Sequence, residues 1–227
     1  MDIDSARAIL KSVGWLAGQP AAFQEQVLSR ITLKLYAAGD VVYRLGGPLG
    51  GVYGLVSGSV VVTTAPPATS PRLFHYATPG SWIGEGCFLS RERRRVGMQA
   101  ATDTCLAYLP LDAMDRIAAQ DPVSIQRFAQ ILILNTDILV RAFYDIQNPD
   151  EQRRIASTLC RIGGTNDMPI PLTQAELGLM SNSSRKQVNS ALSRFEARGW
   201  ITKGYRTVTL KNFAELQAFA RSDEDEA

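Results

Sequence analysis

Two helix-starting motifs stand eleven residues apart near the C-terminal end of the chain. Thr173 is followed three residues later by Glu176, and Ser184 is followed three residues later by Gln187. In each pair, the hydroxyl and the Glu or Gln side chain can satisfy backbone amides that a helix leaves unpaired at its first turn. Only the three residues 181–183 separate the end of the first helix from the start of the second. This spacing predicts a helix-turn-helix.

The second helix of this motif has the residues expected of a DNA-contacting helix. Such a helix enters the major groove with its N-terminal end first. Arginine, lysine and asparagine at that end can hydrogen-bond to base edges, and hydroxyls at helix starts suit phosphate oxygens. Residues 200–210 predict a hairpin wing with basic residues near its tip. The expected DNA-binding residues are Thr173, Gln174, Ser184, Arg185, Lys186, Gln187, Asn189, Lys203 and Arg206.

The charge of the chain is concentrated at its C-terminal end. The net charge of the whole chain is only +2, yet residues 150–211 contain ten Lys and Arg against five Asp and Glu. A local basic excess beside a nearly neutral body indicates a surface that faces phosphates. Residues 216–227 are expected to form an acidic tail.

Residues 31–109 have a different pattern, in which short β-branched or aromatic runs alternate with glycine and proline. Many short strands with regular turn signals are typical of a barrel or a jelly roll. The fold class predicted for the whole chain is therefore α+β. The eight expected strands are Ile31–Tyr36, Val41–Tyr43, Val52–Val56, Val60–Thr64, Leu73–Tyr76, Ser81–Ile83, Gly97–Ala101 and Cys105–Leu109.

A long helix is expected over residues 121–147, beginning at Asp121-Pro122. Its apolar residues recur every seven positions, which indicates packing against a second copy of the same helix. A single amphipathic helix lying on its own domain is the alternative. Asn148–Asp150 would end the helix and act as a hinge. The first seam position holds Ile125, Leu132, Leu139 and Ile146, and the second holds Phe128, Asn135 and Ala142.

The chemistry-bearing residues argue against several classes of protein. The three cysteines are far apart with no CxxC pair, and the chain has one histidine, so we expect neither a metal site nor catalytic residues. The N-terminus is acidic rather than basic, unlike a secretory signal. No uninterrupted apolar run approaches the roughly 20 residues of a membrane span. We therefore expect a cytoplasmic protein without a membrane partner, and not an enzyme.

Taken together, the glycine-punctuated β-segment, the long helix and residues 172–201 resemble the Crp/Fnr superfamily. The resemblance extends from about residue 15 to residue 211. It implies a cyclic-nucleotide-binding type of double-stranded β-helix, a dimerisation helix and a C-terminal winged helix-turn-helix. It also implies a homodimer that binds a near-palindromic site on double-stranded DNA and acts with RNA polymerase. The corresponding domains are 1–120, 121–148, 149–215 and the tail 216–227.

The resemblance also implies a ligand site in the β-domain. Gly84-Glu85 is similar to the family's nucleotide-binding segment, and Arg95, ten residues after Glu85, would neutralise a cyclic phosphate. Val96 stands where a small hydroxyl residue is usual, and Leu139 stands where a polar residue would meet the purine. Cyclic AMP, another cyclic nucleotide or other small ligand, and a ligand-independent pocket all stay open.

Two classes of function are compatible with these patterns. The favoured one is a sequence-specific, ligand-tunable transcription regulator. The alternative is a cyclic-nucleotide-binding module that regulates a protein partner through its C-terminal domain. The two capped helices and the basic wing argue against the alternative.

Overall fold

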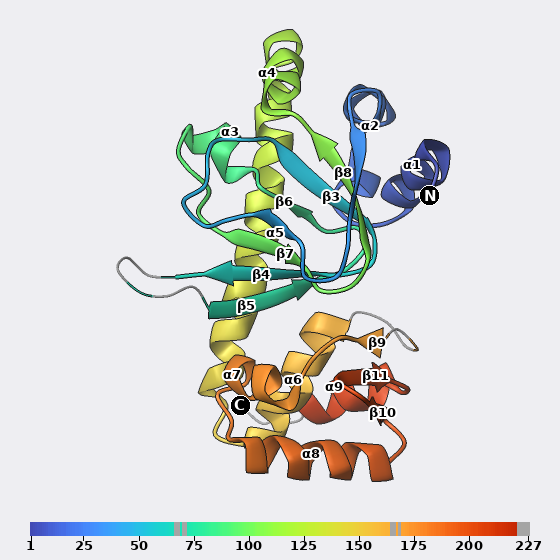
Figure 1. The fold of residues 1–227 in the computed structure, drawn as a ribbon, viewed down its shortest axis with the longest axis vertical. Helices are drawn as coiled ribbons and strands as arrows, with labels where there is room; N and C mark the ends of the chain where they lie inside the picture. The colour runs from blue at the N-terminus through green and yellow to red at the C-terminus, as the bar shows by residue number, and fades with distance from the viewer. Residues whose placement is uncertain (66–68, 70–71, 164–166, 168, 222–227) are drawn as a thin grey trace. The chain divides into compact units, whose positions relative to one another are not determined.

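The computed structural model describes residues 1–65, 69, 72–163, 167 and 169–221. The chain forms two compact units, Met1–Thr136 and Asp137–Ala227 (Figure 1). The boundary between them falls inside the long helix α5 (Val123–Gln147), which therefore begins in one unit and ends in the other.

The first unit is built on eight antiparallel strands in two four-stranded sheets. One sheet has the order β1-β8-β3-β6, and the other has the order β2-β7-β4-β5. The predicted jelly roll and the α+β class are confirmed. The strands are β1 (Thr32–Tyr36), β2 (Val41–Tyr43), β3 (Val52–Ser57), β4 (Val60–Thr64), β5 (Arg72–Ala77), β6 (Trp82–Ile83), β7 (Gly97–Ala100) and β8 (Thr104–Leu109).

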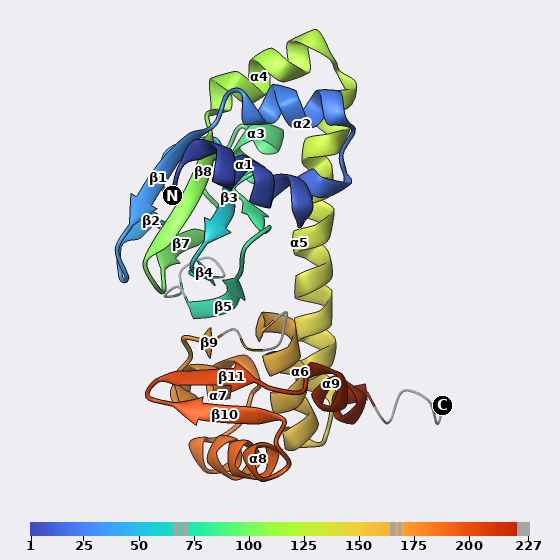
Figure 2. The same cartoon turned by 90° about the vertical axis from the view of Figure 1, so that its right-hand side faces the viewer.

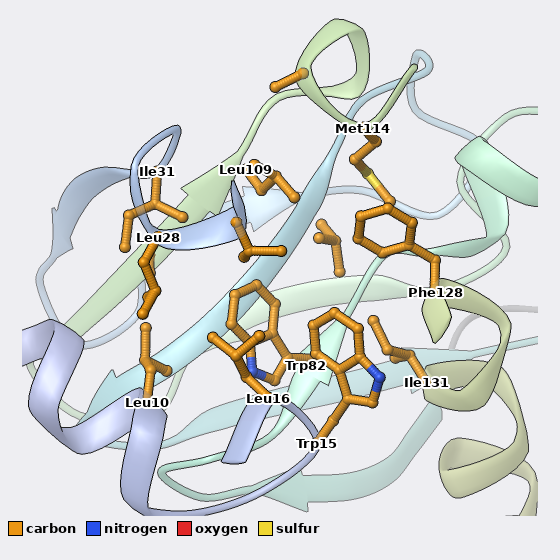
Figure 3. Packing of buried hydrophobic residues seen from close by; sticks show 14 of the residues in the cluster. Leu10, Trp15, Leu16, Leu28, Ile31, Trp82, Leu109, Met114, Phe128 and Ile131 are labelled. Carbon is orange, nitrogen blue, oxygen red and sulfur yellow. The ribbon is translucent and has the colours of Figure 1, made fainter. Parts of the chain in front are cut away.

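Helices cover one side of this jelly roll and close its core with aromatic rings. Phe128 of α5 is fully buried, with ring centroids 5.8 Å from Trp15, 5.3 Å from Phe23 and 5.1 Å from Phe88. Trp15 also lies 5.2 Å from Trp82, and Figure 3 shows both indoles beside the Phe128 ring. The helices of this unit that precede α5 are α1 (Ile3–Ser12), the 3-10 turn η1 (Leu16–Gly18), α2 (Ala21–Leu28), α3 (Gly86–Ser90) and α4 (Leu111–Gln120).

A glycine in β3 allows a close approach to one of the core indoles. A Cβ atom built on Gly54 would lie 2.7 Å from the indole of Trp82, so only glycine lets the ring lie flat on the strand. The indole of Trp15 donates from Nε1 to the carbonyl oxygen of Arg127 at 2.9 Å, which adds a polar link between the N-terminal segment and α5.

The second unit contains four helices and a three-stranded sheet, in addition to the end of α5 (Figure 2). The sheet has the order β10-β11-β9, and β10 and β11 pair as the predicted hairpin wing. The winged helix-turn-helix is confirmed. Its elements are α6 (Glu151–Gly163), β9 (Pro169–Ile170), α7 (Gln174–Met180), α8 (Arg185–Ala197), β10 (Ile201–Gly204), β11 (Thr207–Leu210) and α9 (Phe213–Arg221).

Helix α9 covers the first part of the segment 216–227 that the charge pattern assigns to a tail. Leu216 is fully buried, and Phe219 packs with its ring centroid 5.8 Å from Phe195 and 5.5 Å from Trp200. Residues 216–221 therefore belong to the folded unit. Residues 222–227 lie outside the described part of the chain.

The aromatic core generates a prediction about stability. We expect Phe128→Ala to lower the free energy of unfolding by about 3–5 kcal/mol, because it removes a buried ring and leaves a cavity among three other rings. Urea titration followed by circular dichroism measures the change. Leu35→Ala is the control, because Leu35 is an exposed residue of β1 in the same unit. An equal loss for both variants would contradict the role of the aromatic cluster.

Candidate ligand and DNA-binding sites

A buried arginine lies beside a glycine and a tyrosine inside the jelly roll. Arg94 is only 6% exposed, and its Nη1 donates to the carbonyl oxygen of Gly84 at 3.2 Å. Its guanidinium lies over the ring of Tyr43, 4.2 Å from the centroid. Gly84 has φ +115°, and a Cβ atom there would come within 2.5 Å of Arg94 Nη1. Gly84 is thus required both by its backbone angle and by the approach of the arginine.

The structure places the arginine that spacing predicted for the ligand site on the outside of the domain. Arg95, ten residues after Glu85, is exposed, with 71% of its side chain accessible, and it pairs with Glu92. Arg94 is the arginine held inside, because its backbone pairs with the Gly46–Gly47 loop: its N–H donates to Gly47 at 3.1 Å and its carbonyl accepts from Gly46 at 2.7 Å. Val96 is partly buried against the apolar cluster between the sheets and offers no hydroxyl.

Glu85 lies beside this arginine and links it to the long helix. Its carboxylate accepts from Gly84 N at 2.9 Å and from Asn135 Nδ2 at 3.2 Å. Asn135 also donates to the carbonyl oxygen of Trp82 at 3.3 Å. The carboxyl is buried, and desolvation raises its pKa, although its hydrogen bonds and the charge of Arg94 partly oppose that shift.

The second position of the predicted dimer seam is partly wrong, because two of its residues face their own domain. The side chain of Asn135 points into its own domain rather than toward a partner, and Phe128, another expected seam residue, is in the aromatic core. The first seam position fits better, since Ile125, Leu132 and Leu139 are each exposed by nearly half.

Tyrosines occupy much of the remaining interior near Arg94. The rings of Tyr53 and Tyr108 lie 4.6 Å apart, and Lys34 Nζ is 4.2 Å from the centroid of Tyr108. Tyr43 is partly buried, and its hydroxyl oxygen is buried without a hydrogen-bond partner among the described residues. Burial raises the pKa of Tyr43 above its ordinary value, so the hydroxyl is a neutral donor. A buried unpaired donor close to a guanidinium suits an anionic or polar ligand.

The outer face of α5 is apolar along both units. Among the described helices, only this one is long and apolar enough to cross a membrane by length and composition alone, a feature that the search for uninterrupted apolar runs missed. Its N-terminal part instead packs into the core of the first unit through Phe128 and Ile131. The exposed apolar residues of this face are Ile125, Leu132, Ile133, Leu134, Leu139, Val140, Phe143, Tyr144 and Ile146.

Both predicted capping boxes are formed in the second unit. Thr173 Oγ1 accepts from Glu176 N at 3.2 Å while Thr173 N donates to the Glu176 carboxylate at 2.8 Å. Ser184 and Gln187 make the same reciprocal pair, at 3.3 Å and 2.8 Å. The hydroxyls of Thr173 and Ser184 and the side-chain oxygen of Gln187 are thus engaged in caps, and they set the starts of α7 and α8.

The front of α8 presents free polar groups to solvent. Arg185, Lys186 and Asn189 are exposed on the first turns of the helix, whereas Val188 is buried. Arg185 and Lys186 form no hydrogen bond or ion pair with any residue that the structure describes. Gln174 of α7 donates to Asn189 Oδ1 at 3.4 Å, which connects α7 to the front of α8.

The two basic residues of the wing that were expected to contact DNA, Lys203 and Arg206, differ in their contacts. Lys203 Nζ is 2.9 Å from the Glu196 carboxylate of α8 and donates to Ser193 Oγ at 3.2 Å. Both contacts attach the wing to α8. This pairing lowers the pKa of Glu196. Arg206 is exposed at the tip without an ion pair in the described chain. Tyr205 beside it, 91% exposed, was missed as a candidate although a large aromatic residue at a hairpin tip is an unusual sequence signal.

Comparison with known proteins gives both parts of the chain a family. Residues 33–121 match the family model of the cyclic nucleotide-binding domain, and residues 153–219 match that of the Crp-like helix-turn-helix domain. The CRP-like cAMP-activated global transcriptional regulator of Mycobacterium tuberculosis is 24% identical over 194 residues, covering 82% of this chain and 87% of that protein. The cAMP-activated global transcriptional regulator CRP of Salmonella typhimurium is 24% identical over 213 residues, covering 82% and 92%.

A solved structure shares the fold. FixK2 from Bradyrhizobium japonicum superposes with a TM-score of 0.69 at 18% sequence identity, covering 82% of this chain and 96% of that chain.

The burial of Glu85 predicts a dependence of stability on pH. The unfolded carboxyl titrates near the ordinary value of 4.5, and the folded one titrates higher. As the pH rises through this interval, the unfolded state loses its proton first, so ionisation of Glu85 lowers the free energy of unfolding. We expect the stability of the natural protein, relative to a Glu85→Gln variant, to fall as the pH rises from about 4 to 7. Urea titrations of both proteins measure the difference; a difference that rises with pH would contradict the raised pKa.

Proposed function

Because the chain belongs to the Crp/Fnr superfamily of transcription regulators, we propose that it binds operator DNA with the exposed front of α8. The observation that carries this assignment is the set of Arg185, Lys186 and Asn189, three unburied side chains at the start of a doubly capped helix pair. The guanidinium of Arg185 can form two hydrogen bonds to guanine, and the amide of Asn189 can do so with adenine.

The phosphate contacts are proposed to surround this front. The first amides of α7 and α8, at Gln174 and Arg185, have no partner within their own helices and can bind phosphate oxygens. Arg206 at the wing tip is the cation available to a flanking phosphate. Thr173, Ser184 and Gln187 act by shaping the helix starts, and Lys203 acts by holding the wing against α8.

In the β-domain we propose that Arg94, rather than Arg95, binds the anionic group of an effector. Arg94 has a positive charge inside the domain, and Gly84 allows its guanidinium to approach the backbone closely. The unpaired Tyr43 hydroxyl is available for a polar group of such a ligand. A cyclic nucleotide, cyclic AMP among them, fits this chemistry, and the link from Glu85 to Asn135 would carry its effect to α5.

The apolar outer face of α5 supports a homodimer. Leu132, Leu139 and Ile146 recur at heptad spacing on that face, and Phe143 lies four residues after Leu139. Two copies joined there would present two α8 helices to a near-palindromic site. Such a dimer acts in the cytoplasm, with RNA polymerase as the second partner at a promoter.

The first test addresses DNA binding. We expect Arg185→Ala to weaken binding by about 5- to 150-fold, the equivalent of a lost bidentate base contact. Fluorescence anisotropy would compare a duplex that the natural protein selects from a random library with a scrambled duplex of the same length. Arg116→Ala, which removes an exposed arginine of α4, is the control for lost charge. An unchanged preference for the selected duplex in Arg185→Ala would refute the role in base contact.

The second test compares the two neighbouring arginines. Substitution of Arg94 by Lys keeps the charge but removes the planar donor fork, so we expect it to weaken cyclic nucleotide binding by about tenfold or more. Arg95→Lys, an exposed neighbour, should leave binding unchanged. Calorimetric titration with cyclic AMP and cyclic GMP measures both variants. Loss of binding in Arg95→Lys alone would reverse the assignment, and no binding to the natural protein would exclude these two nucleotides as effectors.

A further inference from the structure

One arginine of the second unit contacts backbone from two separate parts of the chain. Arg154 lies in the first turn of α6, and its guanidinium is hydrogen-bonded to four carbonyl oxygens. Nη1 donates to Asn148 at 2.8 Å and to Pro149 at 3.2 Å, just after the end of α5. Nε donates to Ser181 at 3.0 Å and Nη2 to Asn182 at 3.2 Å, in the turn between α7 and α8.

We propose that Arg154 is a positioning residue that fixes the turn of the helix-turn-helix to the end of α5. It acts through the backbone of residues 181–182, which leads directly into the start of α8. It therefore sets where Arg185 and Lys186 are presented. This inference rests on the proposed function of α8 for its consequence, but not for the contacts themselves.

The choice of arginine has a physical reason. Only a guanidinium has five N–H donors in a planar fork, whereas a lysine has one compact ammonium group. The carbonyls that Arg154 binds directly follow the C-terminal ends of α5 and α7, where the partial negative charge of a helix end favours a cation. The half-buried guanidinium of Arg154 donates to both groups of carbonyls at once.

The turn that Arg154 contacts has a specific shape. Asn182 has φ +47°, in the left-handed region, and Ser183 N donates to the Gly178 carbonyl at 2.8 Å. A Cβ atom at Gly178 would lie only 2.6 Å from the Ser183 carbonyl oxygen, so the turn packs tightly on α7. Arg154 binds the carbonyl oxygens of Ser181 and Asn182 in this tight turn, so we expect the turn to move together with Arg154.

Other contacts brace the same junction from the side of α5. Arg161 Nε lies 3.0 Å from the Asp145 carboxylate, with both side chains almost fully buried, and Ser157 also donates to Asp145. Asp150 caps α6 by accepting from Gln152 N at 2.8 Å. Residues 148–150, expected from the sequence to be a free hinge, are thus held in place, and the end of α5, α6 and the turn form one connected body.

The experiment starts without DNA, using hydrogen exchange of the full-length protein followed by mass spectrometry. Substituting Arg154 by Lys should speed exchange in peptides covering 178–187 by about tenfold or more, because the turn opens locally more often without the guanidinium hydrogen bonds. Peptides covering the wing, 201–210, should be unchanged. Arg153→Lys is the matched control on the same helix, since Arg153 pairs with Asp150 and its guanidinium lies over the ring of Phe219.

Binding to the duplex selected by the natural protein provides the second readout. We expect Arg154→Lys to weaken this binding by about fivefold or more while the dependence of affinity on salt keeps its slope, because no phosphate contact is lost. Unchanged exchange in 178–187, or an equal rise in 178–187 and 201–210, would overturn the proposal. So would a reduced salt slope, which would place Arg154 on a phosphate. If the natural protein bound no duplex, the function of α8 would fail while the exchange result would still decide the role of Arg154.

Discussion

The burial of Phe128 in the aromatic cluster is the contact on which the other features of the first unit depend. Because the ring packs against Trp15, Phe23 and Phe88, the first turns of α5 are fixed in rotation about their own axis. That rotation turns Asn135 inward, two turns later, to Glu85. The same rotation leaves Leu132 and Leu139 facing outward, so one aromatic contact determines both the hydrogen bond from Asn135 to Glu85 and the apolar face that α5 leaves exposed.

Periodicity predicted the regular elements well where it was strong. Glycine-punctuated strands and the two capping boxes depend on local backbone requirements, and both were confirmed. Helix α9 was not predicted, because the acidic composition of residues 216–227 indicated a tail. The helical spacing of Leu216 and Phe219, which are three residues apart and both pack inward, was the signal for it. The inward position of Asn135 could not be predicted, because a heptad pattern gives the faces of a helix but not which of two apolar faces its own domain covers.

The site was predicted less completely than the fold for a related reason. Spacing from Glu85 pointed to Arg95, but five consecutive charged or polar positions in a loop have no periodicity that marks the inward one. What selects Arg94 is a pair of backbone hydrogen bonds to Gly46 and Gly47, which come from a segment nearly fifty residues earlier. Long-range contacts of this kind leave no signal in the local sequence, and neither does the pairing of Lys203 with Glu196.

The contacts of Lys203 and Arg154 hold the wing, α8 and the end of α5 to one another. With Lys203 anchored on Glu196, the wing is attached to α8, and with Arg154 bound to the turn, α8 is attached to the end of α5. The residues that we propose to contact DNA, which are Arg185, Lys186, Asn189 and Arg206, then belong to elements that are held to one another rather than to separate flexible parts. A rigid surface loses less conformational entropy on binding, so more of the interaction free energy appears as affinity.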